Sequence, residues 1–170
     1  MNILFEPMNR SHAEEIISWH YDPPYDIYNM GGQNREDDIA YLLDSQNRFF
    51  AVICESAVIG FRSFGPDGRV FGGEYDDSFT DTGGGLRPDL TGRGLGTEII
   101  KAGIKYGKEE LGIEDFRVTV AAFNMRAIKV CERIGFKERQ RFQRPNDNRE
   151  FVVLEFCATT NDGALARSKK

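Results

Sequence analysis

Apolar residues recur along this chain in two patterns, one typical of strands and the other typical of helices. Short apolar or alternating runs predict seven strands, at residues 2–7, 48–54, 57–62, 70–86, 116–121, 136–142 and 150–157. Apolar residues spaced three or four apart predict four helices, beginning near residue 11 and covering residues 34–43, 95–111 and 124–134. This alternation predicts an α/β (α+β) domain with a mixed, mostly antiparallel sheet and helices on both faces.

Turn and cap residues set the limits of the elements in the first third of the chain. Ser11 and Glu14 have capping-box spacing, and Asn34 is a good N-cap for the second helix. Residues 21–32 hold paired prolines and paired glycines, which break regular structure. Glu55 and Ser56 separate two apolar runs, which is a hairpin signal. We therefore expect strand, helix, aromatic loop, helix and hairpin in that order.

The strand predicted over residues 70–86 has a polar interior and ends in Gly83, Gly84 and Gly85. Glycine weakens a strand unless a ligand or another backbone lies close to it. We therefore expect a long, interrupted strand whose end lies against a ligand. The alternative is a flexible glycine-rich bulge.

A second glycine-rich stretch, Thr-Gly-Arg-Gly-Leu-Gly-Thr at residues 91–97, stands directly before the helix that Gly112 is placed to end. Its glycines let several backbone N–H groups turn toward one point, and the start of a helix favours a phosphate there. The spacing matches neither the dinucleotide fingerprint nor the P-loop. The pattern favours a pyrophosphate-binding loop, with a purely structural turn as the alternative.

A further segment, residues 118–137, reads as a strand, a helix opened by Asn124, and a Gly-Phe pair at its end. Together with the glycine loop it resembles the GNAT acetyltransferase superfamily, whose members use acetyl coenzyme A to acetylate amines. The family's first signature is R/Q-x-x-G-x-G/A, and its second places Asn, Ala and Tyr ahead of Gly-Phe. Thr91 stands where Arg or Gln is usual, and Cys131 stands where Tyr is usual. The resemblance is specific over residues 82–136 and implies a GNAT-type sheet of six to seven strands.

The resemblance implies acetyl coenzyme A as cosubstrate and no metal. In the family, an N–H at the Leu86 position faces the thioester carbonyl, and the residue at the Asn124 position contacts the pantetheine arm. Asn124 is also an expected helix N-cap. The cofactor-binding residues that the resemblance implies are Gly84, Gly85, Leu86, Gly92, Arg93, Gly94, Leu95, Gly96, Thr97 and Asn124.

The proton-transfer residues are open to two interpretations each. In the family, the Tyr at this position usually protonates the departing thiolate. The thiol of Cys131 is an energetically feasible proton donor, although it is shorter than Tyr. The alternative is that Cys131 is a small, buried hydrophobic residue. Some relatives carry a Glu where Thr119 stands, and others a carboxylate on the central strand, for which Asp81 is our candidate base. The alternative for the acidic run around Asp81 is a solvated face, or one that attracts a cation.

In the GNAT fold that the resemblance implies, the segment from Trp19 to Met30 overhangs the thioester end of the cofactor, so we expect it to form the acceptor site. Its aromatic residues stand beside Asp22 and Asp26, a combination that suits an amine. Core packing of the aromatics is the alternative. The aromatic residues expected to bind the acceptor are Trp19, Tyr21, Tyr25 and Tyr28.

Composition narrows the class of protein. The chain has 170 residues, a net charge of -5 and no large basic cluster, which excludes a nucleic-acid footprint. Its three cysteines form no pair typical of zinc sites or disulfide frameworks. No apolar run approaches the length of a membrane span, and the opening residues lack a signal-peptide pattern. We expect a cytoplasmic protein with one domain over residues 1–158 and a flexible tail over 159–170.

The predicted function is direct acetyl transfer from acetyl coenzyme A to a primary amine, most favourably that of a small molecule. A protein lysine or N-terminus is the alternative acceptor. A non-catalytic acyl-coenzyme A sensor is the rival from another class, because Cys131 and Thr119 depart from the family pattern. Edge strands near the C-terminus also allow a homodimer or a structural dimer module.

Overall fold

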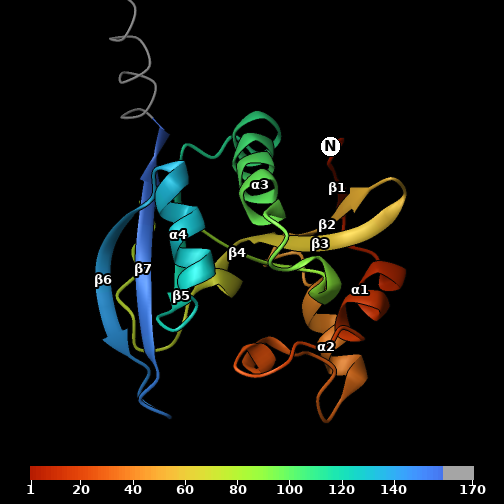
Figure 1. Ribbon diagram of the computed structural model, residues 1–170, viewed down its shortest axis with the longest axis horizontal. Helices are drawn as coiled ribbons and strands as arrows, with labels where there is room; N and C mark the ends of the chain where they lie inside the picture. Colours follow the sequence, from red (N-terminus) through yellow and green to blue (C-terminus); the bar gives the residue numbers. More distant parts are fainter. Residues whose placement is uncertain (159–170) are drawn as a thin grey trace, which may run out of the picture.

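The computed structural model describes residues 1–158, so the tail predicted over 159–170 lies outside the described residues. Strands and helices follow one another in the order that the apolar pattern predicts (Figure 1). The elements are β1 (Leu4–Pro7), α1 (Arg10–Ile17), η1 (Tyr25–Tyr28), α2 (Arg35–Leu43), β2 (Phe49–Cys54), β3 (Ala57–Phe64), η2 (Pro66–Gly68), β4 (Thr80–Leu86), η3 (Pro88–Leu90), α3 (Leu95–Leu111), β5 (Asp115–Ala121), α4 (Met125–Ile134), β6 (Lys137–Gln143) and β7 (Glu150–Cys157).

The strands form one seven-stranded sheet in the order β1-β2-β3-β4-β5-β7-β6. All neighbours are antiparallel except β4 and β5, which are parallel and pair only at Thr80 with Phe116 and at Asp81 with Arg117. Beyond these two pairs β4 continues along β3, and β5 continues along β7. The sheet therefore opens between β4 and β5, and we call this opening the splay.

Helices cover both faces of the sheet, as the alternation predicts (Figure 1). On β2, Ala51 packs with the core under α1 and α2, while its neighbour Val52 packs with Ile99 of α3. The same face as α3 carries α4, whose Ile128 shares a core with Val118 of β5. Alternate residues of a strand point to opposite faces, so the sheet separates an α1/α2 layer from an α3/α4 layer.

Two details of the predicted elements are wrong. The cap of α1 is Asn9, whose side chain accepts the N–H of His12, and not Ser11. The long strand predicted from residue 70 is a strand only over β4, because residues 70–79 leave the sheet and lie against β5. Tyr75 in that segment contacts Thr119, with 3.0 Å between the two hydroxyl oxygens. Asn34 does cap α2, and residues 55 and 56 do form the predicted hairpin turn.

Candidate active site

The glycine run at the end of β4 pairs with β3, and β3 lies so close that side chains at these positions would clash with it. A Cβ built on Gly84 would lie 2.5 Å from the carbonyl oxygen of Phe61, and one on Gly85 would lie 2.6 Å from the Phe61 ring. Gly83 and Gly85 pair with residues of β3 in regular register. The run is therefore not a loose bulge, and β3 can approach β4 closely because the side chains are missing.

The backbone of β4 presents hydrogen-bonding groups to the splay. The N–H of Arg87 donates to the carbonyl of Ile59 at 2.8 Å, which marks Arg87 as a residue bonded to β3. Because such bonds alternate along an antiparallel pair, the N–H and C=O groups of Gly84 and Leu86 point away from β3. The Leu86 carbonyl accordingly accepts the hydroxyl of Tyr21 at 2.8 Å. The edge that faces the splay thus offers two N–H groups, those of Gly84 and Leu86.

The predicted phosphate loop joins β4 to the start of α3. Gly92 (φ 73°) and Gly94 (φ 81°) both adopt the left-handed conformation that favours glycine. Gly94 is the N-cap and has no side chain to accept the first N–H groups of the 17-residue helix. These N–H groups and the helix dipole suit an anion. Arg93, the loop's own cation, is exposed.

Arg126 is a second cation beside this loop, and the sequence analysis missed it. Its Nη1 lies 3.5 Å from the position that a Cβ on Gly92 would occupy, and its guanidinium lies 4.2 Å from the centre of the Tyr25 ring. Stacking on Tyr25 fixes the guanidinium near the loop. The only sequence signal is a basic residue two positions after the Asn that opens α4.

Asn124 is the N-cap of α4, as the sequence predicts. Its Oδ1 accepts the N–H of Ala127 at 3.2 Å, and its Nδ2 donates to the hydroxyl of Tyr28 at 3.3 Å. Burial raises the pKa of Tyr28, so this hydroxyl keeps its proton. The side chain of Asn124 therefore joins the start of α4 to the loop that precedes α2.

That loop, which contains η1, connects the two sides of the splay. Tyr21 reaches the end of β4, and burial raises its pKa to about 12. Tyr25 and Tyr28 pack on Phe123, which follows β5; their ring centres lie 5.6 Å and 6.4 Å from that of Phe123. Trp19 is instead buried with Phe61 in the core under α1 and α2, as the core-packing alternative expects. Three of the four predicted acceptor aromatics thus lie at the splay.

Cys131 lies on the inner face of α4 and is only 2% exposed. Its neighbours belong to the core between α3, α4 and the sheet. Burial raises the pKa of the Cys131 thiol to about 11, which makes it a weaker acid than an ordinary thiol. Both observations favour the interpretation of Cys131 as a small hydrophobic core residue.

Asp81 is buried at the point where β4 and β5 separate, and arginines occupy both of its oxygens. Arg117 donates from Nε to Oδ1 at 2.7 Å and from Nη2 to Oδ2 at 2.9 Å. Arg69 donates from Nε to Oδ2 at 2.7 Å. The pairing with Asp81 raises the pKa of Arg117. Arginine N–H groups thus already engage both carboxylate oxygens, which leaves Asp81 poorly placed to take a proton from an amine. The geometry favours a structural role for Asp81.

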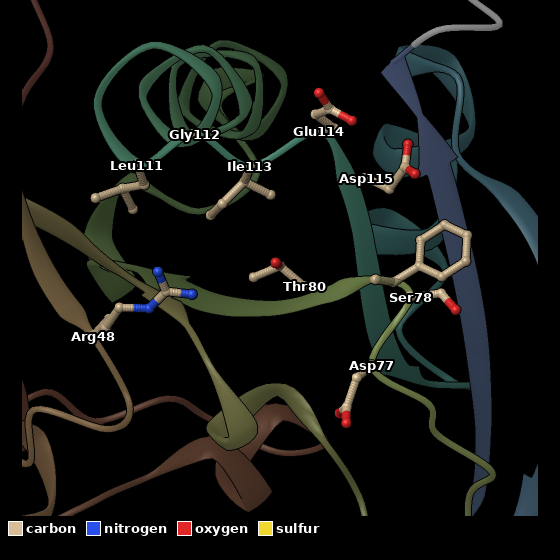
Figure 2. Close-up of a pocket in the computed structure, with 10 residues that line it drawn as sticks. Arg48, Asp77, Ser78, Thr80, Leu111, Gly112, Ile113, Glu114 and Asp115 are labelled. Atoms are coloured by element: carbon tan, nitrogen blue, oxygen red, sulfur yellow. The ribbon is translucent and has the colours of Figure 1, made fainter.

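A depression of about 350 Å³ lies elsewhere, at the closed end of the β4–β5 pair. Figure 2 shows that Arg48, Thr80 and Asp115 are among the side chains around it, beside the end of α3. It lies at the opposite end of β4 from the glycine run, so the splay and not this depression is the candidate site. Among residues 1–158, no three His, Cys, Asp or Glu side chains are grouped to hold a metal ion. No helix in that part of the chain is long and apolar enough to cross a membrane.

Comparisons with known proteins bear on the family and the fold. The family model described as an acetyltransferase (GNAT) domain matches residues 2–137. The structure is similar to that of a GNAT-family acetyltransferase from Bacillus anthracis, with a TM-score of 0.70, 18% identity and coverage of 94% of this chain and 96% of the other.

Two further solved structures share the fold. One is a chimera of the spermidine N-acetyltransferase SpeG from Vibrio cholerae and hSSAT, with a TM-score of 0.73, 15% identity and coverage of 96% of this chain and 99% of the other. The other is AAC(6')-Ib in complex with ribostamycin and coenzyme A, with a TM-score of 0.75, 16% identity and coverage of 100% and 99%.

Proposed function

Because the chain belongs to the GNAT family of acetyltransferases, we propose that it transfers the acetyl group of acetyl coenzyme A directly to the primary amine of a small molecule. The observation that carries the proposal is the meeting of three features at one end of the splay. The first is the edge of β4, whose backbone N–H groups face the splay. The second is the glycine loop at the start of α3, and the third is the tyrosine-containing loop that connects the two sides of the splay.

The residues that would hold the cosubstrate follow from their positions. Its pyrophosphate suits the N–H groups of residues 92–97 at the start of α3, with Arg126 beside Gly92 as a cation. Its pantetheine arm suits the edge of β4 at Gly84 to Leu86, where it can pair like an added strand. When bound, acetyl coenzyme A supplies the activated acetyl group.

The chain's own contribution to the chemistry is electrostatic. The N–H of Leu86 points toward the splay and can stabilise the oxygen of a thioester carbonyl as its negative charge develops. Preformed backbone donors of this kind need no rearrangement during the reaction. Neither Asp81 nor Cys131 is well placed to move a proton, so we assign the proton that the amine loses to water in the splay.

The residues around the expected acceptor site suit a cationic amine. The tyrosine loop carries Asp22 and Asp26 next to Tyr21, Tyr25 and Tyr28, which suits a cationic amine. The chain's net charge of -5 agrees with a cationic partner. The solved structures with the same fold include enzymes named for spermidine and one bound to the aminoglycoside ribostamycin. These observations favour a polyamine or aminoglycoside-like amine over a protein acceptor.

Thiol release from acetyl coenzyme A by the purified protein tests the proposal. We expect slow release alone and faster release when one class of small amine is added from a panel of polyamines, aminoglycosides, amino acids and peptides. Coenzyme A binding measured by calorimetry on the same sample is the matched control. Tight binding without stimulated release would support the sensor interpretation and overturn ours.

A further inference from the structure

Arg62 on β3 is a buried cation without a carboxylate. It is only 6% exposed, and its Nε is buried without a hydrogen-bond partner. Within residues 1–158, no side chain forms an ion pair or a hydrogen bond with its guanidinium. Burial lowers the pKa of Arg62. Burying an unpaired charge destabilises a protein, so this residue demands an explanation that packing alone does not give.

The side chain of Arg62 crosses β4 on the face that α3 and α4 cover. Arg62 pairs with Gly84, and paired residues of neighbouring strands share a face. A Cβ on Gly84 would lie 3.3 Å from Arg62 Nη1, and one on Gly103 of α3 would lie 2.8 Å from its Cδ. Missing side chains on both neighbours thus leave room for the guanidinium to extend over β4 toward the splay.

The titratable groups closest to the Arg62 guanidinium do not form an ion pair with it. The titratable group that interacts with it is the thiol of Cys131 on α4, and α3 contributes Gly103 at the contact. The nearby carboxylates of β4 and η2, Asp81 and Asp67, belong to the opposite face. Asp81 there binds two other arginines, and Asp67 accepts the hydroxyl of Ser63. Among residues 1–158, no carboxylate is paired with Arg62 or offsets its charge.

We propose that Arg62 stabilises the negative charge that forms on the sulfur of coenzyme A when the acetyl group leaves. The inference rests on the proposed function. Position 131 is the place where the family pattern has the tyrosine that protonates this sulfur, and here it holds a short, buried thiol that interacts with Arg62. The guanidinium supplies a fixed positive charge where that proton donor is missing.

The step balances without a further reactant. The amine nitrogen forms a bond to the thioester carbonyl carbon, and the carbon–sulfur bond breaks with its electron pair going to sulfur. The amine nitrogen gives one proton to water. Arg62 stays protonated throughout, holds the thiolate by charge, and releases it to take a proton from solvent when it leaves the site.

The test measures the pKa of the coenzyme A thiol while it is bound, from the ultraviolet absorbance of the thiolate across a pH series. We expect the bound thiol in the native protein to ionise at least about one pH unit below the free thiol. In Arg62→Met we expect that shift to vanish, kcat for acetyl transfer to fall about 10- to 100-fold, and the melting temperature of the protein to stay equal or rise. Arg62→Lys should restore part of the shift.

Arg117→Met is the matched control, because Arg117 is equally buried but is paired with Asp81. That variant should lose stability and keep the thiol shift. If Arg62→Met folds poorly, Arg62→Gln is neutral, keeps polar groups and takes its place. An unshifted thiol pKa in the native protein, or a shift that survives loss of the charge, would overturn the proposal. Absence of coenzyme A binding altogether would instead overturn the proposed function.

Discussion

Arg117 donates hydrogen bonds to both carboxylate oxygens of Asp81, at 2.7 and 2.9 Å. These two residues form one of the two backbone pairs that join β4 to β5. Both side chains are almost fully buried, at 2% and 3% exposure. This ion pair links β4 to β5 at the closed end of the splay, and beyond it the two strands separate. The opening in which we place the cofactor therefore begins at an ion pair.

Removing one partner of this ion pair should cost stability and not chemistry. Asp81→Ala leaves Arg117 buried without its carboxylate, and we expect a loss of about 3–5 kcal/mol in the free energy of unfolding. The double variant Asp81→Leu with Arg117→Met should recover much of that loss. Denaturant unfolding measures both. An Asp81→Asn protein of native stability that loses turnover and its pH dependence would instead identify Asp81 as the base.

Cys131 should make stability depend on alkaline pH. Its pKa rises on folding from 9.0 to about 11, so in this range the folded state holds the proton more tightly than the unfolded state. The stabilisation is complete below pH 9 and is lost as the pH rises toward 11, by roughly 2–3 kcal/mol. Cys131→Ala should lack this slope, as urea unfolding at pH 8 and pH 10.5 would show.

The same variant separates the two interpretations of Cys131 in catalysis. If the residue is a core hydrophobe, Cys131→Ala keeps the native kcat at neutral pH after correction for the folded fraction. Tyr21, whose pKa rises to about 12, contributes to the alkaline loss in both proteins and therefore cancels in the comparison. A large drop in kcat with an altered pH profile would show that the thiol is the acid.

The glycine at the start of α3 offers a prediction with a matched control in the same helix. Gly94 and Gly112 both adopt left-handed conformations, and a Cβ at either would meet nothing within 4 Å. Changing either to Ala should therefore cost a similar amount, about 1 kcal/mol. Only Gly94→Ala should raise the Kd of coenzyme A, because only that end carries the phosphate loop. Equal affinity in the two variants would remove the loop from the cofactor site.

Arg126 should bind the phosphates of the cosubstrate, because its guanidinium stacks on Tyr25 and lies beside the glycine loop. A hydrogen bond to a charged group contributes about 1.5–3 kcal/mol, so Arg126→Ala should raise the Kd of coenzyme A by at least about tenfold. Arg133→Ala, which removes an exposed arginine from the other end of α4, should not. Calorimetry at two salt concentrations measures both. Identical affinities in the two variants would contradict this assignment.

The parts of the fold and site that sequence predicts are those set by local patterns. The helix at Leu95 to Leu111, its left-handed Gly112 and the cap at Asn124 all follow from residues close together in the chain. Their neighbours in space do not. Residues 70–79 have strand-like length, but this segment forms no ladder, and its Tyr75 contacts Thr119 and Arg117 of β5.

The same limit explains which site residues were missed or placed differently. Asp81 reads as a free carboxylate until the parallel pairing brings Arg117 beside it, 36 residues later. In the sequence, Arg62 is the polar residue that ends a predicted hairpin strand. Its burial follows only from its contacts with Gly84 and Gly103 in the fold. Trp19 stands with the loop aromatics in sequence, but the end of α1 directs it into the core. Each of these depends on contacts between distant segments.

Direct acetyl transfer to a small-molecule amine requires one specific product, which mass spectrometry can identify. The protein would be given acetyl coenzyme A together with a polyamine, an aminoglycoside and a lysine-containing peptide with a free N-terminus, in competition. We predict one acetyl group on a small amine, formed in step with free coenzyme A, and an unmodified peptide. An acetylated peptide as the sole product, or bound coenzyme A with no acetylated product at all, would overturn the proposed function.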